Sequence, residues 1–196
     1  LIVAVDPFSR VELSLKGQMG MMNQKIPDVG SDFEKFFRAW GIEYNRNEIL
    51  GDLQYSAQVN AGGQVVPYPF WMNMGKGAFS DQSAISSKLS QVLFGEGGAV
   101  KLKAEQPLKF EALVKTTKQS GFAPASLASI MGARDFAGQL KVENQSKAIV
   151  GLLTGKFKSA FAKGKPSGNE SAAPHIAEAA EPGAVLIIAD TDFMHD

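Results

Sequence analysis

The segments LIVAVD (residues 1–6) and VLIIAD (residues 185–190) carry the clearest structural pattern in the chain. Each runs through consecutive apolar residues, without polar alternation, straight into an aspartate. Strands that read this way are typical of parallel sheets covered by helices on both faces. We therefore expect Leu1–Val5 and Val185–Ala189 to be strands, with Asp6 and Asp190 marking their ends.

A helix is predicted early in the chain, in SDFEKFFRAWG (residues 31–41). Ser31 and Glu34 have the spacing of a capping box, and Gly41 supplies a left-handed stop. Aromatic residues follow at the spacing of one buried helix face, at Phe33, Phe36, Phe37 and Trp40. The pattern favours a helix that packs on the core over one that binds a partner.

The remaining segments alternate between strand and helix signals. AVKLKA (residues 99–104) and FEALVKTT (residues 110–117) read as strands, and Ser83–Val92 reads as a helix. GGQVVPYPFWMNM (residues 62–74) reads as a loop or an edge, because Pro67 and Pro69 lack the N–H that a central strand donates. The alternation predicts an α/β fold, a three-layer sandwich with a largely parallel sheet.

Composition sets limits on the function. The 196 residues suit a single domain, and the net charge of zero gives no basic footprint for nucleic acid. The absence of cysteine excludes disulfides and thiolate catalysis. Residues 162–183 are rich in Lys, Gly, Pro, Ser, Ala and Glu, and we expect a mobile excursion there.

Catalytic strings are missing from the sequence. No G-x-S-x-G motif occurs, and GLLTGKF (residues 151–157) has the wrong spacing for a phosphate-binding loop. We therefore predict no enzymatic activity and no cofactor.

The strand-end aspartates leave two interpretations open. If the first and last strands are parallel neighbours, Asp6, Asp190 and Asp192 meet at one sheet edge and could hold Mg²⁺ or Ca²⁺, with His195 or Asp196 nearby. The alternative, which we favour, is that Asp190 caps the following turn through its side chain.

A partner contact is the second candidate site. YPFW (residues 68–71) is dense in aromatic residues of the kind enriched at binding surfaces. If they are exposed, Tyr68, Phe70 and Trp71 are the best candidates for such a contact; if they are buried, they belong to the core.

The combination and order of several motifs resembles a known family. The motifs are DPFSR (6–10), WGI (40–42), LGDLQYSAQV (50–59), YPFW (68–71), TGKFKSAF (154–161) and ADTDFMHD (189–196). Together they look like the extracytoplasmic domain of the gliding-motility-type auxiliary component of ABC transport systems, an uncharacterised ABC-type transport auxiliary family.

The resemblance implies a soluble α/β domain related to class I glutamine-amidotransferase-like and flavodoxin-like folds. It implies a piece, here residues 1–196, of a longer protein anchored in the cell membrane by flanking helices, with this domain on the periplasmic side. The expected function is non-catalytic binding of a partner protein or glycan, together with an ABC permease and ATPase or another envelope protein. The alternative is a divalent-metal-dependent hydrolase or carbohydrate-binding enzyme that uses the strand-end aspartates.

Overall fold

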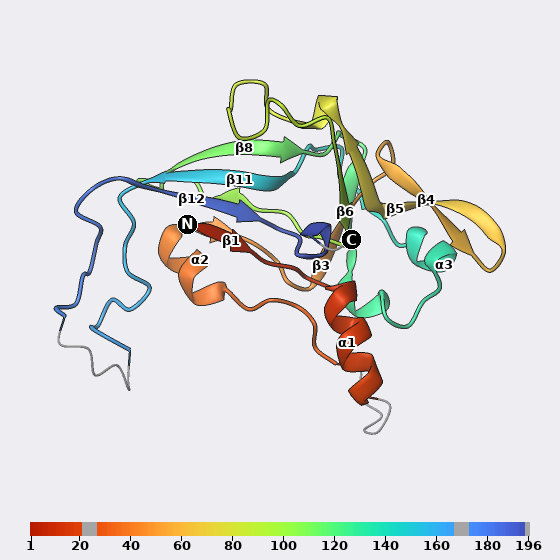
Figure 1. The fold of residues 1–196 in the computed structure, drawn as a ribbon, viewed down its shortest axis with the longest axis horizontal. Coiled ribbons are helices and arrows are strands. Elements are labelled where there is room, and N and C mark those ends of the chain that lie inside the picture. Colours follow the sequence, from red (N-terminus) through yellow and green to blue (C-terminus); the bar gives the residue numbers. More distant parts are fainter. Residues whose placement is uncertain (21–26, 167–172, 195–196) are drawn as a thin grey trace.

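The computed structural model describes residues 1–20, 27–166 and 173–194, in which short helices flank several small sheets (Figure 1). The helices are α1 (Arg10–Gly20), α2 (Glu34–Trp40) and α3 (Ala133–Ala137), with single 3-10 turns η1 (Lys76–Ala78), η2 (Ala125–Leu127) and η3 (Asp192–Met194). The strands are β1 (Ile2–Ala4), β2 (Ile42–Glu43), β3 (Glu48–Asp52), β4 (Ser56–Ala61), β5 (Gln64–Gly75), β6 (Gln91–Gly95), β7 (Lys101–Leu102), β8 (Lys109–Lys115), β9 (Ser120–Pro124), β10 (Lys141–Val142), β11 (Ala148–Gly155) and β12 (Gly183–Ile188).

The first and last strands are parallel neighbours, which is the condition under which the strand-end aspartates meet at one sheet edge. They belong to a four-stranded sheet in the order β1-β12-β11-β8, with Val3 opposite Ile187. β11 is antiparallel to both β12 and β8. The last strand of the chain therefore lies inside this sheet, between the first strand and β11.

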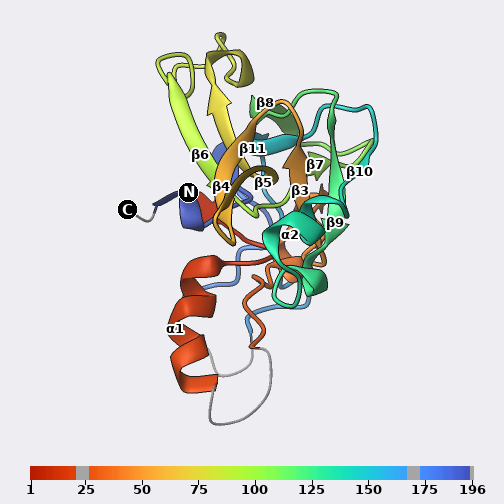
Figure 2. The same cartoon turned by 90° about the vertical axis from the view of Figure 1, so that its right-hand side faces the viewer.

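The other sheets are smaller and antiparallel. β10, β9 and β3 form one, β4, β5 and β6 form another, and β2 pairs with β7. Figure 2 shows α1 standing away from these strands.

The predicted three-layer α/β sandwich with a largely parallel sheet is wrong. The described chain is mostly strand, arranged in several small and mostly antiparallel sheets with few helices. The error has a physical cause. A strand that is apolar on both faces indicates that both faces are buried, but it does not indicate whether the neighbouring strands run parallel or antiparallel to it. β12 is buried on both sides, by α2 on one face and by strands on the other.

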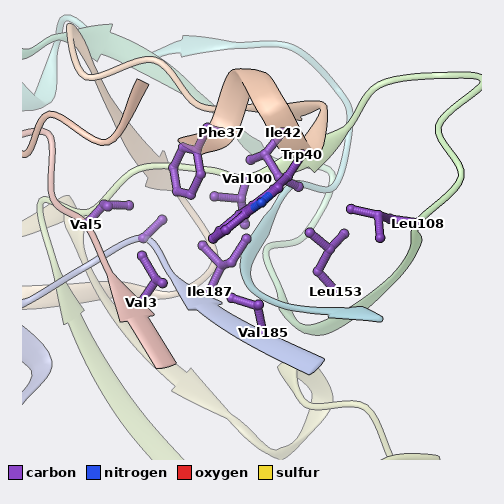
Figure 3. Packing of buried hydrophobic residues seen from close by; sticks show 11 residues of the cluster. Val3, Val5, Phe37, Trp40, Ile42, Val100, Leu108, Leu153, Val185 and Ile187 are labelled. Carbon is purple, nitrogen blue, oxygen red and sulfur yellow. The ribbon is translucent and has the colours of Figure 1, made fainter. Parts of the chain in front are cut away.

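The core explains that double burial. On one face of β12, Val185 and Ile187 pack with Phe37 and Trp40 of α2 (Figure 3). On the other face, Leu186 and Ile188 pack against a cluster drawn from other strands, which includes Leu50, Met72, Met74, Phe94, Leu113 and Ile149. The central sheet thus separates two apolar clusters.

The aromatic stripe of α2 packs on the core as predicted, but the start of the helix differs. Gly41 has φ 70° and ends the helix in the left-handed conformation. The helix begins at Glu34 and not at a Ser31 cap. Ser31 Oγ instead accepts the N–H of Asp6 at 3.0 Å, which ties this segment to the end of β1.

The segment with two prolines is a central strand, contrary to our expectation. β5 pairs with β4 from Gln64 to Tyr68, and beyond a bulge the two strands make one further pair, at Met72. β5 pairs with β6 only from Trp71 onward. Pro67 and Pro69 therefore lie in the half of β5 that β6 does not flank, where a missing N–H costs no bond to that strand.

The helix predicted over Ser83–Val92 is also absent, since turns lead there into β6. Of the excursion predicted over 162–183, residues 167–172 lie outside the described residues.

Candidate functional site

Asp6 lies at the end of β1, and its carboxylate binds the segment after β12. Asp6 Oδ2 accepts the N–H and the Oγ1–H of Thr191, both at 2.9 Å. Asp6 Oδ1 accepts the N–H of Phe8 at 2.8 Å. The side chain is buried, and burial raises the pKa of Asp6 to about 7, with a further contribution from the charge of Asp192.

Asp190 lies at the end of β12 and joins two loops. Its Oδ2 accepts the N–H of Gly95 at 2.6 Å, and its Oδ1 accepts the N–H groups of Asp192 at 2.6 Å and Phe193 at 3.1 Å. Burial raises the pKa of Asp190 to about 8, and the charge of Asp6 adds to that shift. Asp190 thus caps η3, as the favoured interpretation of the sequence has it.

The Asp192 carboxylate accepts hydrogen bonds from residues at the start of α1. Its Oδ2 accepts the N–H of Arg10 at 2.6 Å, and its Oδ1 accepts the hydroxyl of Ser9 at 2.7 Å. A carboxylate at this position satisfies N–H groups that have no partner within the helix and interacts favourably with the helix dipole.

The structure brings the three aspartates together at one sheet edge, but each carboxylate faces N–H and O–H donors. Within residues 1–20, 27–166 and 173–194, no group of three His, Cys, Asp or Glu side chains is placed to hold a metal ion. His195 and Asp196, the further ligands considered for such a site, lie outside the described residues. The observed arrangement joins the first and last strands to α1 and η3.

A buried cluster that the sequence did not predict lies next to these aspartates. Glu96 is fully buried; it accepts a hydrogen bond from the Tyr68 hydroxyl, and its Oε1 accepts Arg10 Nη2 at 2.6 Å. Arg10 Nε also donates to Glu96, and burial together with the Glu96 charge raises the pKa of Tyr68. Arg10 thereby connects α1 to β5 through Glu96.

The backbone of Glu96 is unusual as well. Its φ of 58° is uncommon for a residue with a side chain, and its N–H donates to Phe70 O at 2.7 Å. The two signals available in the sequence were GEGG (residues 95–98) and DPFSR (residues 6–10), and neither predicts that Glu96 and Arg10 meet.

The predicted partner contact at residues 68–71 is divided between core and surface. Tyr68 and Phe70 are buried and pack with Phe136 of α3. Trp71, whose ring meets that of Tyr68 edge to face with centroids 6.3 Å apart, keeps 37% of its surface exposed.

Trp71 borders a surface cavity of about 510 Å³. Its neighbours there come from α1, β6 and η3: Arg10, Val11, Gln91, Val92, Leu93, Gly95, Asp192 and Phe193. Of the three aspartates, Asp192 thus lines the same surface cavity as Trp71.

No described helix combines the length and the apolar content needed to cross a membrane. Neither a curated protein nor a solved structure matches the chain. One family model does match, and its alignment extends over residues 1–196. On that full-length match, the chain belongs to the family described as "ABC-type uncharacterized transport system", the auxiliary components of such systems.

Proposed function

We propose that the chain is a non-catalytic accessory domain on the extracytoplasmic side of the membrane that binds another protein of its ABC-type transport system. Family membership supports an auxiliary role in transport. The observation that carries the proposal is the exposed position of Trp71 beside the cavity between α1 and β6.

The contact surface consists of Trp71 and Leu93 with a polar margin. Both side chains lie on the outer face of β5 and β6, with 37% and 48% of their surface exposed. Gly95 lies opposite Trp71, and the indole packs over this glycine, with Nε1 3.7 Å from the place a Cβ would take, an ordinary van der Waals distance. A tryptophan supported in this way is typical of the residues that dominate binding energy at interfaces.

The hydrogen bonds of the aspartates support the non-catalytic part of the proposal. Asp6, Asp190 and Asp192 direct their oxygens at backbone and hydroxyl donors of neighbouring segments. A general acid or base needs to reach a substrate proton, and Asp6 and Asp190 are fully buried. Their role in this fold is to hold strands, helix and turn together.

Binding to the permease subunit of the same system tests the proposal. The purified domain is immobilised, and the detergent-solubilised permease is titrated over it. Trp71→Ala should weaken binding at least about tenfold, as expected of an aromatic residue at an interface centre. Ile176→Ala is the matched control, because Ile176 is also strongly exposed but lies on the segment that precedes β12.

Two results would contradict the proposal. Failure of the unmodified domain to bind the permease would show that the permease is not its partner. The unmodified domain, Trp71→Ala and Leu93→Ala are first shown to be folded by circular dichroism. If all three then bind equally well, the surface around Trp71 is not the contact.

A further inference from the structure

A second and larger cavity, of about 930 Å³, lies apart from the Trp71 surface and shares no lining residue with it. Its walls come from α2, β2, β7, β8 and the segment 145–148. The volume lies within the range of ~300–1,000 Å³ that is typical of small-molecule sites.

Aromatic rings form the apolar part of the wall. They belong to Phe33, Phe37, Tyr44, Phe110 and Phe122. Phe37 contacts Phe33 and Tyr44 edge to face, with ring centroids 5.2 and 5.7 Å apart. The rings on the α2 side are therefore continuous and can cover the body of a flat or apolar ligand.

Most of the cations in the wall already have a carboxylate partner. Arg38 pairs with Glu34, and Lys101 with Glu43. Arg46 is held by Asp28. Lys147 likewise pairs with Glu143, at 2.5 Å.

Two lysines are left available to a ligand. Lys103 and Lys115 are exposed and line the cavity, and their ammonium groups have no ion-pair or hydrogen-bond partner within the part of the chain that the structure describes. Among the carboxylates of the wall, Glu34 and Glu43 are paired, and Asp32 Oδ1 accepts the N–H of Glu34 at 3.2 Å. Glu48 is the one carboxylate of the wall without such a partner among the described residues.

From this arrangement we infer that the cavity binds a small organic anion, one that joins an apolar or aromatic body to a single carboxylate, sulfonate or phosphate group. The rings cover the body, and Lys103 or Lys115 neutralises the acidic group. Glu48 opposes binding, because its charge has the same sign as that of the ligand.

Fluorescence titration with three probes separates the two parts of this inference. Anilinonaphthalene sulfonate carries both an aromatic body and an anionic group. Phenyl-naphthylamine carries the body without the charge, and inorganic phosphate carries the charge without the body. The sulfonate should bind at one saturable site, the neutral amine more weakly, and phosphate should fail to displace the sulfonate.

Charge variants then place the probe in the cavity. Lys103→Gln and Lys115→Gln should each weaken sulfonate binding by about two- to fivefold, and Glu48→Gln should strengthen it by about twofold. Lys109→Gln is the matched control for Lys115→Gln, because both lysines are exposed on β8 and only Lys115 lines the cavity. Trp71→Ala should leave sulfonate binding unchanged, which separates this site from the surface of the proposed function.

Several outcomes would overturn the inference. Equal affinity for the neutral amine would show that the site does not require an anionic group. Displacement of the sulfonate by phosphate alone would show that it does not require an aromatic body. Identical binding by the unmodified domain and by the double variant Lys103→Gln/Lys115→Gln would show that the probe binds outside the cavity.

Discussion

Arg10 and Glu96 are 86 residues apart in the chain, and the Arg10 guanidinium lies against the Glu96 carboxylate, with Nη2 2.6 Å from Oε1. The two side chains differ in exposure, since that of Arg10 is 40% exposed and that of Glu96 is fully buried. Removal of one partner therefore has a different consequence from removal of the other.

Arg10→Met should destabilise the protein more than Glu96→Gln. The first change leaves a buried carboxylate without its cation and should cost about 3 kcal/mol. The second leaves a partly solvated cation and an amide that can still accept from Tyr68, and should cost about 1 kcal/mol. Urea unfolding measures both. Lys16→Met, which removes the exposed pair with Glu12, is the control and should change stability by less than about 0.5 kcal/mol. An equal loss in Arg10→Met and Glu96→Gln would contradict this account.

Stability should rise as the pH falls from 8.5 to 5.5. Burial raises the pKa of Asp6 to about 7 and that of Asp190 to about 8, from an ordinary value of 3.8. In this window the folded state binds protons that the unfolded state does not, so each group stabilises the fold at low pH and loses that contribution as the pH rises through its folded pKa. The gain should be on the order of 3 kcal/mol, measured by urea unfolding at a series of pH values. Asp190→Asn should flatten the slope between pH 6 and pH 8, whereas an unmodified protein of constant stability would exclude these shifts.

Divalent metals should leave the thermal midpoint unchanged. A ligand that binds only the folded state must raise the midpoint. The oxygens of Asp6, Asp190 and Asp192 instead accept hydrogen bonds from neighbouring segments. Titration with Mg²⁺, Ca²⁺ and Mn²⁺, followed by thermal unfolding, should give no shift. A saturable increase that is absent in Asp190→Asn would restore the metal interpretation.

Gly97→Ala should destabilise the protein by about 1–3 kcal/mol, as overpacking of a filled site does. A Cβ at position 97 would lie 2.6 Å from Ala189 O and 2.9 Å from the Cβ of Asp190. Gly75→Ala is the control, because a Cβ there meets no atom within 4 Å. Comparison of the two midpoints in urea measures the difference, and equal midpoints would show that the segment can move away from β12.

Some features could be predicted from sequence because they depend on local patterns. The apolar runs before Asp6 and Asp190 predict two strands, and both are present as β1 and β12, which are parallel neighbours. The spacing of the α2 aromatics predicts the buried helix face, and Gly41 its end.

Other features depend on contacts between distant segments. The antiparallel β11 lies between β8 and β12, and nothing in the sequence of β12 specifies the direction of its neighbour. Strand β5 tolerates Pro67 because β6 begins to pair with β5 only at Trp71. The contact between Arg10 and Glu96 depends on the left-handed backbone of Glu96, a conformation that its residue type does not favour.

The position of β12 between β1 and β11 has a consequence for biosynthesis. β1 is translated before every other strand described here, yet its partner in the sheet is β12, which is translated after all of them. The apolar cluster that contains Val3 and Trp40 is incomplete until Ile187 has been translated. The nascent chain must therefore keep β1 and α2 without their native packing partners until Ile187 has been translated, and this part of the domain completes its folding only after β12 has been made.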